Sequence, residues 1–148
     1  MTAEDKDGLI STATVNWITQ ASFKPTLVAV GVKADSQIYD IVKTAGNFAL
    51  NVLGKRQHGT AYAFFKPAER DGQKISGEPF RAGSTGAPVL ENTPAFVECR
   101  LVTTVEEGNH SIFVAEVVDA GVTHEPEGRA DEATMLLKDL SEKIFYGD

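Results

Sequence analysis

The residues that could do chemistry in this chain are mostly polar and uncharged, and they gather near its N-terminus. From Leu9 to Trp17 apolar and polar residues alternate, which predicts a strand with Thr12, Thr14 and Asn16 on one face. Hydroxyls and an amide can donate or accept hydrogen bonds without adding net charge, so this face suits a bound polar ligand. Threonine is also common on an ordinary solvent-facing strand, and the pattern alone does not separate the two readings.

A second candidate site is the start of a predicted helix. Apolar residues recur at helical spacing from Ser36 to Ala45, with Ser36 as the N-cap and Gly46 as the stop. The run from Leu27 to Lys33 is apolar on both faces and predicts a buried strand just before this helix. Free N–H groups and the helix dipole would then attract an anion, with Lys33 beside them. A routine cap next to a surface lysine has the same sequence.

Other chemistries lack the residues that they need. His58, His110, His124 and Cys99 are scattered without the spacing of a zinc site. Neither a G-x-S-x-G nucleophile elbow nor a G-x-G-x-x-G dinucleotide fingerprint occurs. The segment Gly83–Gly86 looks like a phosphate loop but lacks the lysine and Ser/Thr spacing of a P-loop. The residues alone thus indicate no nucleophilic or acid–base catalyst.

Length, charge and cysteine content narrow the class of protein. A chain of 148 residues predicts a single domain, residues 1–148. The formal net charge of −7 argues against nucleic acid and anionic membrane surfaces as partners. One cysteine cannot form an internal disulfide, which fits a reducing, cytoplasmic location, and neither a signal peptide nor a membrane-length apolar run is present.

The rest of the chain reads as short strands with a few helices. A turn at Glu4–Gly8 precedes the Leu9–Ile18 strand, and Thr19–Pro25 is expected to be a connection. The other predicted elements are a strand at Asn47–Leu53, a short helix at His58–Phe65, an irregular stretch at Lys66–Pro94, paired strands at Ala95–Val105 and Ser111–Gly121, and a strand or short helix at Met135–Phe145. Alternation in Ala95–Val105 turns Glu98 and Arg100 outward. The irregular stretch should pack down through Ile75, Phe80, Val89 and Leu90.

Several segments, taken in order, resemble one known family. They are Thr14–Val30 (T-x-N-W-x-T-Q-x-S-F-x-P-x-L-V-A-V), Lys33-x-x-Ser36, Gly46–Leu53, Lys74–Gly77, Thr85–Leu90, Gly108–Val114 and Phe145–Gly147. In this set and spacing the chain is similar to the flavin reductase-like family of FMN-binding split-barrel proteins. That family includes flavin reductase partners of two-component monooxygenases, flavoredoxins and ferric reductases.

The resemblance implies a fold and a cofactor site. The fold would be all-β with minor helices, a six-stranded antiparallel Greek-key split barrel that forms a homodimer. Thr14, Asn16, Trp17 and Thr19 would line the isoalloxazine and ribityl chain of FMN, and main-chain N–H groups from Val15 to Ile18 would face the polar edge of the ring. Gln20, Ser22, Lys33 and Ser36 would meet the ribityl chain and phosphate, and Tyr146 would lie over the flavin. His110 would lie on the nicotinamide side, although Asn109 replaces the family's aspartate beside it.

The function that the resemblance implies is transfer of hydride from NAD(P)H to flavin. FMN would be either a prosthetic group or a substrate, and FAD or riboflavin could also be the substrate. A flavin performs this chemistry itself, which fits a chain without its own catalyst. The partner could be a monooxygenase or an electron-transfer protein. One alternative is a flavoredoxin-like electron carrier without NAD(P)H activity, and another is a flavin-storing module. Met1–Ala3 resembles the end of a family strand, so we also expect an N-terminal strand that is truncated.

Overall fold

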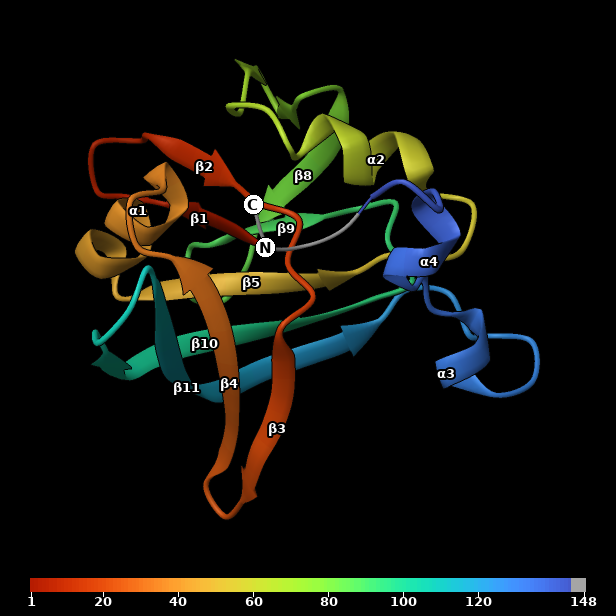
Figure 1. The fold of residues 1–148 in the computed structure, drawn as a ribbon. Helices are drawn as coiled ribbons and strands as arrows, with labels where there is room; N and C mark the ends of the chain where they lie inside the picture. The colour runs from red at the N-terminus through yellow and green to blue at the C-terminus, as the bar shows by residue number, and fades with distance from the viewer. Residues whose placement is uncertain (145–148) are drawn as a thin grey trace.

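The computed structural model describes residues 1–144, which form two antiparallel sheets with short helices around them (Figure 1). The seven-stranded sheet has the order β2-β1-β5-β10-β11-β4-β3, and the four-stranded sheet has the order β6-β7-β8-β9. The strands are β1 (Thr2–Glu4), β2 (Ile10–Thr12), β3 (Ile18–Phe23), β4 (Thr26–Lys33), β5 (Asn47–Val52), β6 (Arg70–Asp71), β7 (Lys74–Ile75), β8 (Glu78–Ala82), β9 (Pro88–Leu90), β10 (Ala95–Val105) and β11 (His110–Val122). The helices are α1 (Gln37–Ala45), α2 (His58–Ala63), α3 (Ala130–Ala133) and α4 (Leu137–Leu140).

The predicted class, all-β with minor helices, is confirmed. The main sheet has seven strands where six were expected, because β3 forms in the stretch that was expected to be a connection. The predicted strands β4, β5, β10 and β11 and the predicted helices α1 and α2 are present, with ends shifted by a few residues. Among residues 1–144 there is no helix with the length and apolar character needed to span a membrane.

The Leu9–Ile18 strand prediction is wrong in its middle. Residues 13–17, which we call the crossing segment, belong to no strand, and β3 begins where a connection was expected. In the sheet order β2 and β3 lie at opposite edges, so the crossing segment carries the chain from one edge to the other. Alternation of apolar and polar residues marks any extended chain with one side buried, whether or not it pairs in a sheet.

The crossing segment also shows how strongly the sheet curves. In a flat sheet, six interstrand steps of about 4.8 Å would separate the edge strands by about 29 Å. The six residue steps from Thr12 to Ile18 span at most about 22 Å. The two edges therefore approach each other where the crossing segment runs from the end of β2 to the start of β3 (Figure 1).

The main core fills the inside of this curve, beneath α1. It joins Val30 and Val32 of β4 to Phe48 of β5, Phe113 of β11, and the apolar face of α1. Helix α1 begins and ends as predicted: Ser36 Oγ accepts the Tyr39 N–H, and Gly46 ends the helix with φ of 75°.

The Lys66–Pro94 stretch packs against the barrel as expected, since Ile75, Phe80, Val89 and Leu90 are all buried. It forms the smaller sheet, and its β8–β9 loop lies on the outer face of β10. Glu98 points outward from the main core, as predicted, but this loop covers it and leaves it 0% exposed.

Candidate functional site

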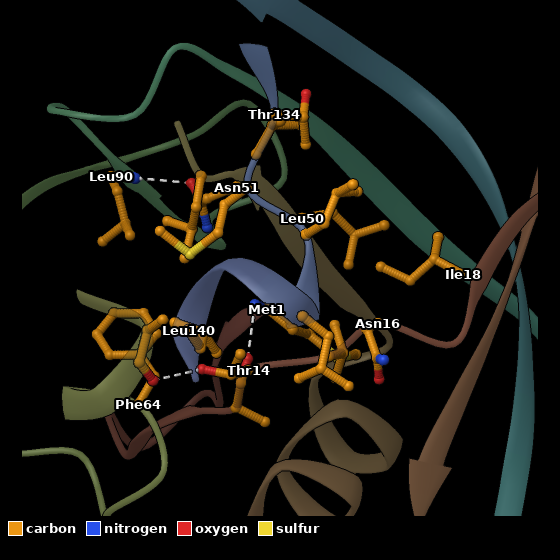
Figure 2. Close-up of a pocket in the computed structure, with 18 of the residues that line it drawn as sticks. Met1, Thr14, Asn16, Ile18, Leu50, Asn51, Phe64, Leu90, Thr134 and Leu140 are labelled. Atoms are coloured by element: carbon orange, nitrogen blue, oxygen red, sulfur yellow. Dashed lines mark hydrogen bonds between the residues drawn. The ribbon is translucent and has the colours of Figure 1, made fainter. Parts of the chain in front are cut away.

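The crossing segment borders two cavities, each of about 330 Å³. The first, which we call the apolar pocket, lies between the crossing segment, β5 and the C-terminal segment Thr134–Leu140, with Met1, Phe64 and Leu90 completing its walls (Figure 2). The second, the polar cleft, lies between residues 11–14, the start of α1 and residues 64–67. Thr14 lines both cavities. Volumes near 300 Å³ are at the lower end of the range for small-molecule sites.

The polar side chains of the apolar pocket are mostly committed to the protein. Asn51 Oδ1 accepts the Leu90 N–H at 2.9 Å, and its Nδ2 donates to Thr2 Oγ1 at 3.0 Å. Thr14 Oγ1 donates to the Ala61 carbonyl at 2.8 Å (Figure 2). This leaves apolar walls with Asn16 at their edge, an arrangement that suits a planar, largely apolar ligand.

Main-chain donors in the crossing segment are not committed in this way. The Ala13 N–H donates to the Met1 carbonyl at 3.0 Å. In the described part of the chain, the N–H groups of Thr14, Val15 and Asn16 have no acceptor from the protein. Thr14 and Val15 are half-buried and Asn16 is exposed, so water or a ligand in the pocket can accept from these three N–H groups.

The start of α1 offers two further donors to the polar cleft. Ser36 Oγ donates to the Lys33 carbonyl at 2.6 Å and accepts the Tyr39 N–H at 3.3 Å, so this hydroxyl is occupied. Within residues 1–144, the Gln37 and Ile38 N–H groups have no protein acceptor, and both residues line the cleft. The helix dipole adds partial positive charge at this end.

The predicted site residues that the structure describes lie in three places: beside the two cavities, along β3 and at the end of β4, and on the outer face of the sheet. Thr14, Val15, Asn16 and Ile18 line the apolar pocket, and Thr14 and Ser36 line the polar cleft. Thr19, Gln20 and Ser22 lie along β3, with Ser22 half-buried and the other two exposed. Lys33 ends β4, lines neither cavity and pairs with Asp35 at 3.3 Å. Tyr146 lies outside the described residues.

Trp17 and His110 form the third place, on the outer face of the sheet. Their rings are 4.9 Å apart between centroids, and His110 is paired in register with Lys33. Trp17 packs so closely on Gly31 that a Cβ at residue 31 would lie 3.0 Å from the indole ring. His110 Nδ1 lies 3.0 Å from Asn109 Oδ1, so the amide oxygen accepts where an aspartate would in the family pattern.

The C-terminal wall of the apolar pocket was not foreseen from the sequence as part of a site. The Met135 N–H donates to the Leu53 carbonyl at 2.8 Å, and Tyr62 Oη donates to the Leu140 carbonyl at 3.0 Å. His58 Nε2 donates to the Asp139 carbonyl at 2.9 Å. Helix α2 therefore holds α4 against the pocket, and these contacts join residues too far apart in sequence for a local pattern to reveal.

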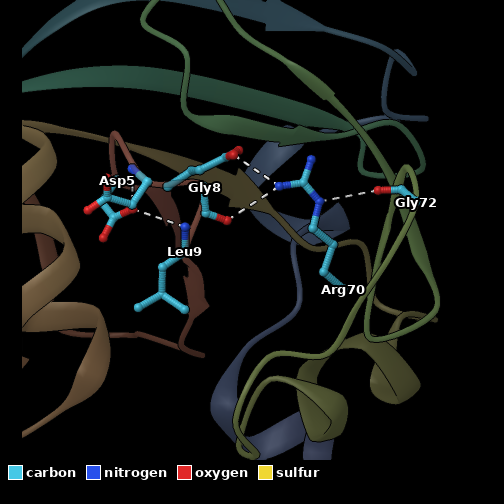
Figure 3. Close-up of polar contacts among 7 residues, drawn as sticks. Asp5, Gly8, Leu9, Arg70 and Gly72 are labelled. Carbon is cyan, nitrogen blue, oxygen red and sulfur yellow. Dashed lines mark hydrogen bonds and ion pairs between the residues drawn. The ribbon is translucent and has the colours of Figure 1, made fainter.

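The entry into the crossing segment is fixed by Arg70 of the smaller sheet (Figure 3). Its Nη1 donates to Glu4 Oε1 at 3.0 Å and to the Gly8 carbonyl at 3.4 Å, and its Nε donates to the Gly72 carbonyl at 3.3 Å. On the other side of the turn, Asp5 Oδ1 accepts the Leu9 N–H at 2.9 Å. The β1–β2 turn is thereby tied to the smaller sheet, which sets the direction in which β2 leads into the crossing segment.

Other reactive groups do not form a centre. In residues 1–144, no three His, Cys, Asp or Glu side chains are grouped closely enough to hold a metal ion. Burial raises the pKa of the Cys99 thiol to about 12, so this cysteine is not a nucleophile at neutral pH.

Comparison with known proteins identifies the family of this chain. A model of the "Flavin reductase like domain" matches residues 1–139. A flavin reductase from Pseudomonas putida is 34% identical over 125 residues, which cover 84% of this chain and 72% of that protein. A probable flavin reductase from Rhizobium meliloti is longer: it is 31% identical over 79% of this chain but only 37% of its own length.

Solved structures are similar as well. The styrene monooxygenase flavin reductase from Pseudomonas putida S12 superposes with a TM-score of 0.71 at 28% identity, covering 83% of this chain and 78% of that one. An NADH:FAD oxidoreductase from Streptomyces globisporus C-1027, solved in complex with NAD and FAD fragments, gives a TM-score of 0.69 at 27% identity, covering 82% and 71%.

Proposed function

This chain belongs to the flavin reductase like domain family, and from that premise we propose that it is an NAD(P)H-dependent flavin reductase that binds FMN. The observation that carries the proposal is the crossing segment. Its uncommitted N–H groups at Thr14, Val15 and Asn16 border an apolar pocket that adjoins a cleft with helix-start donors. FMN has the same sequence of parts: an apolar ring with one polar edge, a polyol chain and a phosphate.

When bound, the flavin supplies the hydride and electron-transfer chemistry. The protein's part is to place the ring and to stabilise charge at its polar edge. The crossing-segment N–H groups would donate to that edge, where negative charge develops on reduction, for the same reason that oxyanion holes work. Val15, Ile18 and the other apolar walls would exclude water from the ring.

The residues of β3 and of the α1 start would hold the rest of the cofactor. Gln20 and Ser22 would meet the ribityl chain, and Ser36 would set the α1 start at the phosphate. Lys33 is left out of the phosphate contact, because it pairs with Asp35 and lines neither cavity. Thr19 would lie beside the ring. Tyr146 would also be part of the cofactor site.

The nicotinamide of NAD(P)H would approach from the side of Trp17 and His110. His110 is fixed by Asn109, and Trp17 is fixed against Gly31, so both rings are positioned before any ligand binds. We assign His110 to orientation of the nicotinamide and give it no proton-transfer step.

A homodimer is also part of the proposal. Trp17, Val105 and Ile112 are 47%, 44% and 45% exposed, and the register Val105↔Ile112↔Gly31 puts them on one outer face of the sheet. Such a patch is typical of a protein–protein contact. A monooxygenase that receives reduced flavin is the proposed physiological partner, in line with the name of the styrene monooxygenase flavin reductase. A cytoplasmic location is proposed with it, because the single cysteine is buried and free of disulfide bonding.

Flavin titration with amide hydrogen exchange tests the proposal. We expect FMN to quench its fluorescence on binding with Kd tighter than about 100 μM, a binding free energy near −5.5 kcal/mol. FMN should slow exchange at Thr14, Val15 and Asn16 and leave Ser84 and Thr85, which already donate to Glu98, unchanged. Oxidation of NADH or NADPH with added FMN should follow. Flavin binding without NAD(P)H oxidation would instead identify an electron carrier, and no binding would refute the flavin site.

A further inference from the structure

We infer that Lys66 and Thr12, on the walls of the polar cleft, make this protein selective for phosphorylated flavins. The inference rests on the proposed function, because it takes the flavin's phosphate as the ligand of the cleft. Neither residue lies in a segment that the family resemblance assigned to the site.

Thr12 carries a buried hydroxyl without a partner. The residue is 8% exposed, and its Oγ1 is buried and makes no hydrogen bond in the described structure. Neighbouring Ser11, which also lines the cleft, has its hydroxyl 3.4 Å from Gln37 Oε1. A buried polar atom without a partner is uncommon in folded proteins, and a bound acceptor or an ordered water removes the cost. The Thr12 hydroxyl is therefore a donor that the protein leaves for something in the cleft.

Lys66 brings the positive charge. It follows α2 and lines the cleft, and no carboxylate among residues 1–144 pairs with its ammonium group. Lys33, the lysine closer in sequence to the helix, instead pairs with Asp35 and lies outside the cleft. The chain as a whole carries a net charge of −7. A lysine that pairs with no carboxylate and lies in the same cleft as the start of α1 makes this place locally positive.

The four groups together select one chemistry. The Gln37 and Ile38 N–H groups, the Thr12 hydroxyl and the Lys66 ammonium can all donate; the ammonium carries a full positive charge and the two N–H groups a partial one. A phosphate monoester provides a dianion with three acceptor oxygens, which matches several donors around one point. Riboflavin lacks this group, so the cleft should distinguish FMN from riboflavin.

The test compares FMN and riboflavin affinities of the full chain and three variants. Lys66→Gln removes the charge and keeps most of the side-chain length, and Thr12→Val removes the hydroxyl at nearly constant shape. Lys33→Gln is the matched control, since it removes a lysine that lies near the same helix but outside the cleft. Circular dichroism melting confirms that each variant is folded.

We expect Lys66→Gln to weaken FMN binding about tenfold to a hundredfold and Thr12→Val about tenfold, with riboflavin affinity changed less than about twofold. Lys33→Gln should change FMN affinity by about threefold or less, as for an exposed charge. Equal losses for both flavins, or a loss for Lys33→Gln as large as that for Lys66→Gln, would overturn the assignment.

Two further outcomes separate this inference from its premise. If the unmodified chain binds neither flavin, the proposed function fails and the inference fails with it. If Lys66→Gln leaves FMN affinity unchanged but raises the KM for NADPH and not for NADH, the cleft holds a nicotinamide phosphate, and the flavin assignment alone is overturned.

Discussion

The loop Gly83–Gly86 and the start of α1 both offer backbone N–H groups that can bind an anion. In the loop, the Ser84 and Thr85 N–H groups donate to the Glu98 carboxylate at 2.9 Å each, and Thr85 Oγ1 donates to Glu98 Oε1 at 2.7 Å. At the helix, the Gln37 and Ile38 N–H groups have no acceptor from residues 1–144. The first set of donors is satisfied by the protein, and the second set is not.

This difference separates a structural anion site from a ligand site. The carboxylate of Glu98 stands where a phosphate would in a phosphate loop, and a Cβ at residue 83 would lie 2.2 Å from its Oε1. The loop therefore needs Gly83 for close approach, as phosphate loops need their glycines. Its sequence looks like a phosphate loop but lacks the lysine and Ser/Thr spacing of a P-loop, and the α1 start was the phosphate site that the resemblance implied. Whether such N–H groups can bind a ligand depends on whether another part of the protein already supplies their acceptor.

Replacing Glu98 gives the largest effect. Glu98→Ala removes the acceptor of two N–H groups and a hydroxyl, three hydrogen bonds at about 1 kcal/mol each, so we expect a loss of about 3 kcal/mol in the free energy of unfolding. Urea denaturation measures it. Flavin affinity of the folded fraction should be unchanged, because the loop lies on the outer face of β10.

The control for this change is Glu116→Ala on the neighbouring strand. Glu116 pairs with Arg100 at 2.7 Å, but the two side chains are 33% and 61% exposed. We expect the control to lose less than about 1 kcal/mol. A Glu98→Ala variant no less stable than the control would mean that the loop is held by its apolar contacts alone.

Much of the fold followed from local patterns. Helix α1 was predicted with its cap and stop because Ser36, Gly46 and the apolar face between them are all local signals. The crossing segment was mistaken for a strand because its alternation reflects one buried side, and only the sheet order shows that β2 and β3 lie at opposite edges.

The site was predictable to the extent that it lies on one stretch of chain. Thr14, Val15, Asn16 and Ile18 line the apolar pocket as the Thr14–Val30 motif implied. Lys66 could not be found in this way, because it is distant in sequence from α1, and only the tertiary fold brings both to the same cleft. Glu98 was read as an outward residue because alternation gives direction, and it cannot show that a loop 13 residues away covers that face.

Two Thr→Val substitutions, one in the loop and one in the cleft, should change the free energy of unfolding in opposite directions. Thr85→Val removes a hydroxyl that donates to Glu98 and accepts the Ala87 N–H at 3.2 Å, so it should destabilise the protein by about 1–2 kcal/mol. Thr12→Val removes a buried hydroxyl without a partner in the described structure, so it should stabilise the free protein by about 0.5–1 kcal/mol. Urea midpoints of both variants without flavin measure the difference. Destabilisation by Thr12→Val would show that this hydroxyl has a partner, such as bound water, in the free protein.

The smallest effect lies at the rim of the loop and depends on pH. Ser84 Oγ donates to Asp119 Oδ2 at 2.6 Å, and the Ala120 N–H donates to Oδ1 at 2.8 Å. The Ser84 hydroxyl, with the Ala120 N–H second, holds the pKa of Asp119 below its ordinary value of 3.8. The folded protein thus binds this proton less readily than the unfolded chain, so the contribution of Asp119 to stability is complete above pH 4 and is lost as the pH falls through the lowered pKa.

Replacing Ser84 or Asp119 should therefore reduce the loss of stability that the protein shows as the pH falls. Urea midpoints at pH 7 and pH 3 should differ less in Asp119→Asn and in Ser84→Ala than in the unmodified chain. Because Ser84 acts only through the Asp119 carboxylate, the double variant should show the same pH dependence as Asp119→Asn alone. If the two changes were additive, Ser84 would not be the group that lowers the pKa, and the remaining donor, the Ala120 N–H, would have to account for it. The α1 start offers no counterpart to this acid-dependent step, since its donors meet no carboxylate within residues 1–144.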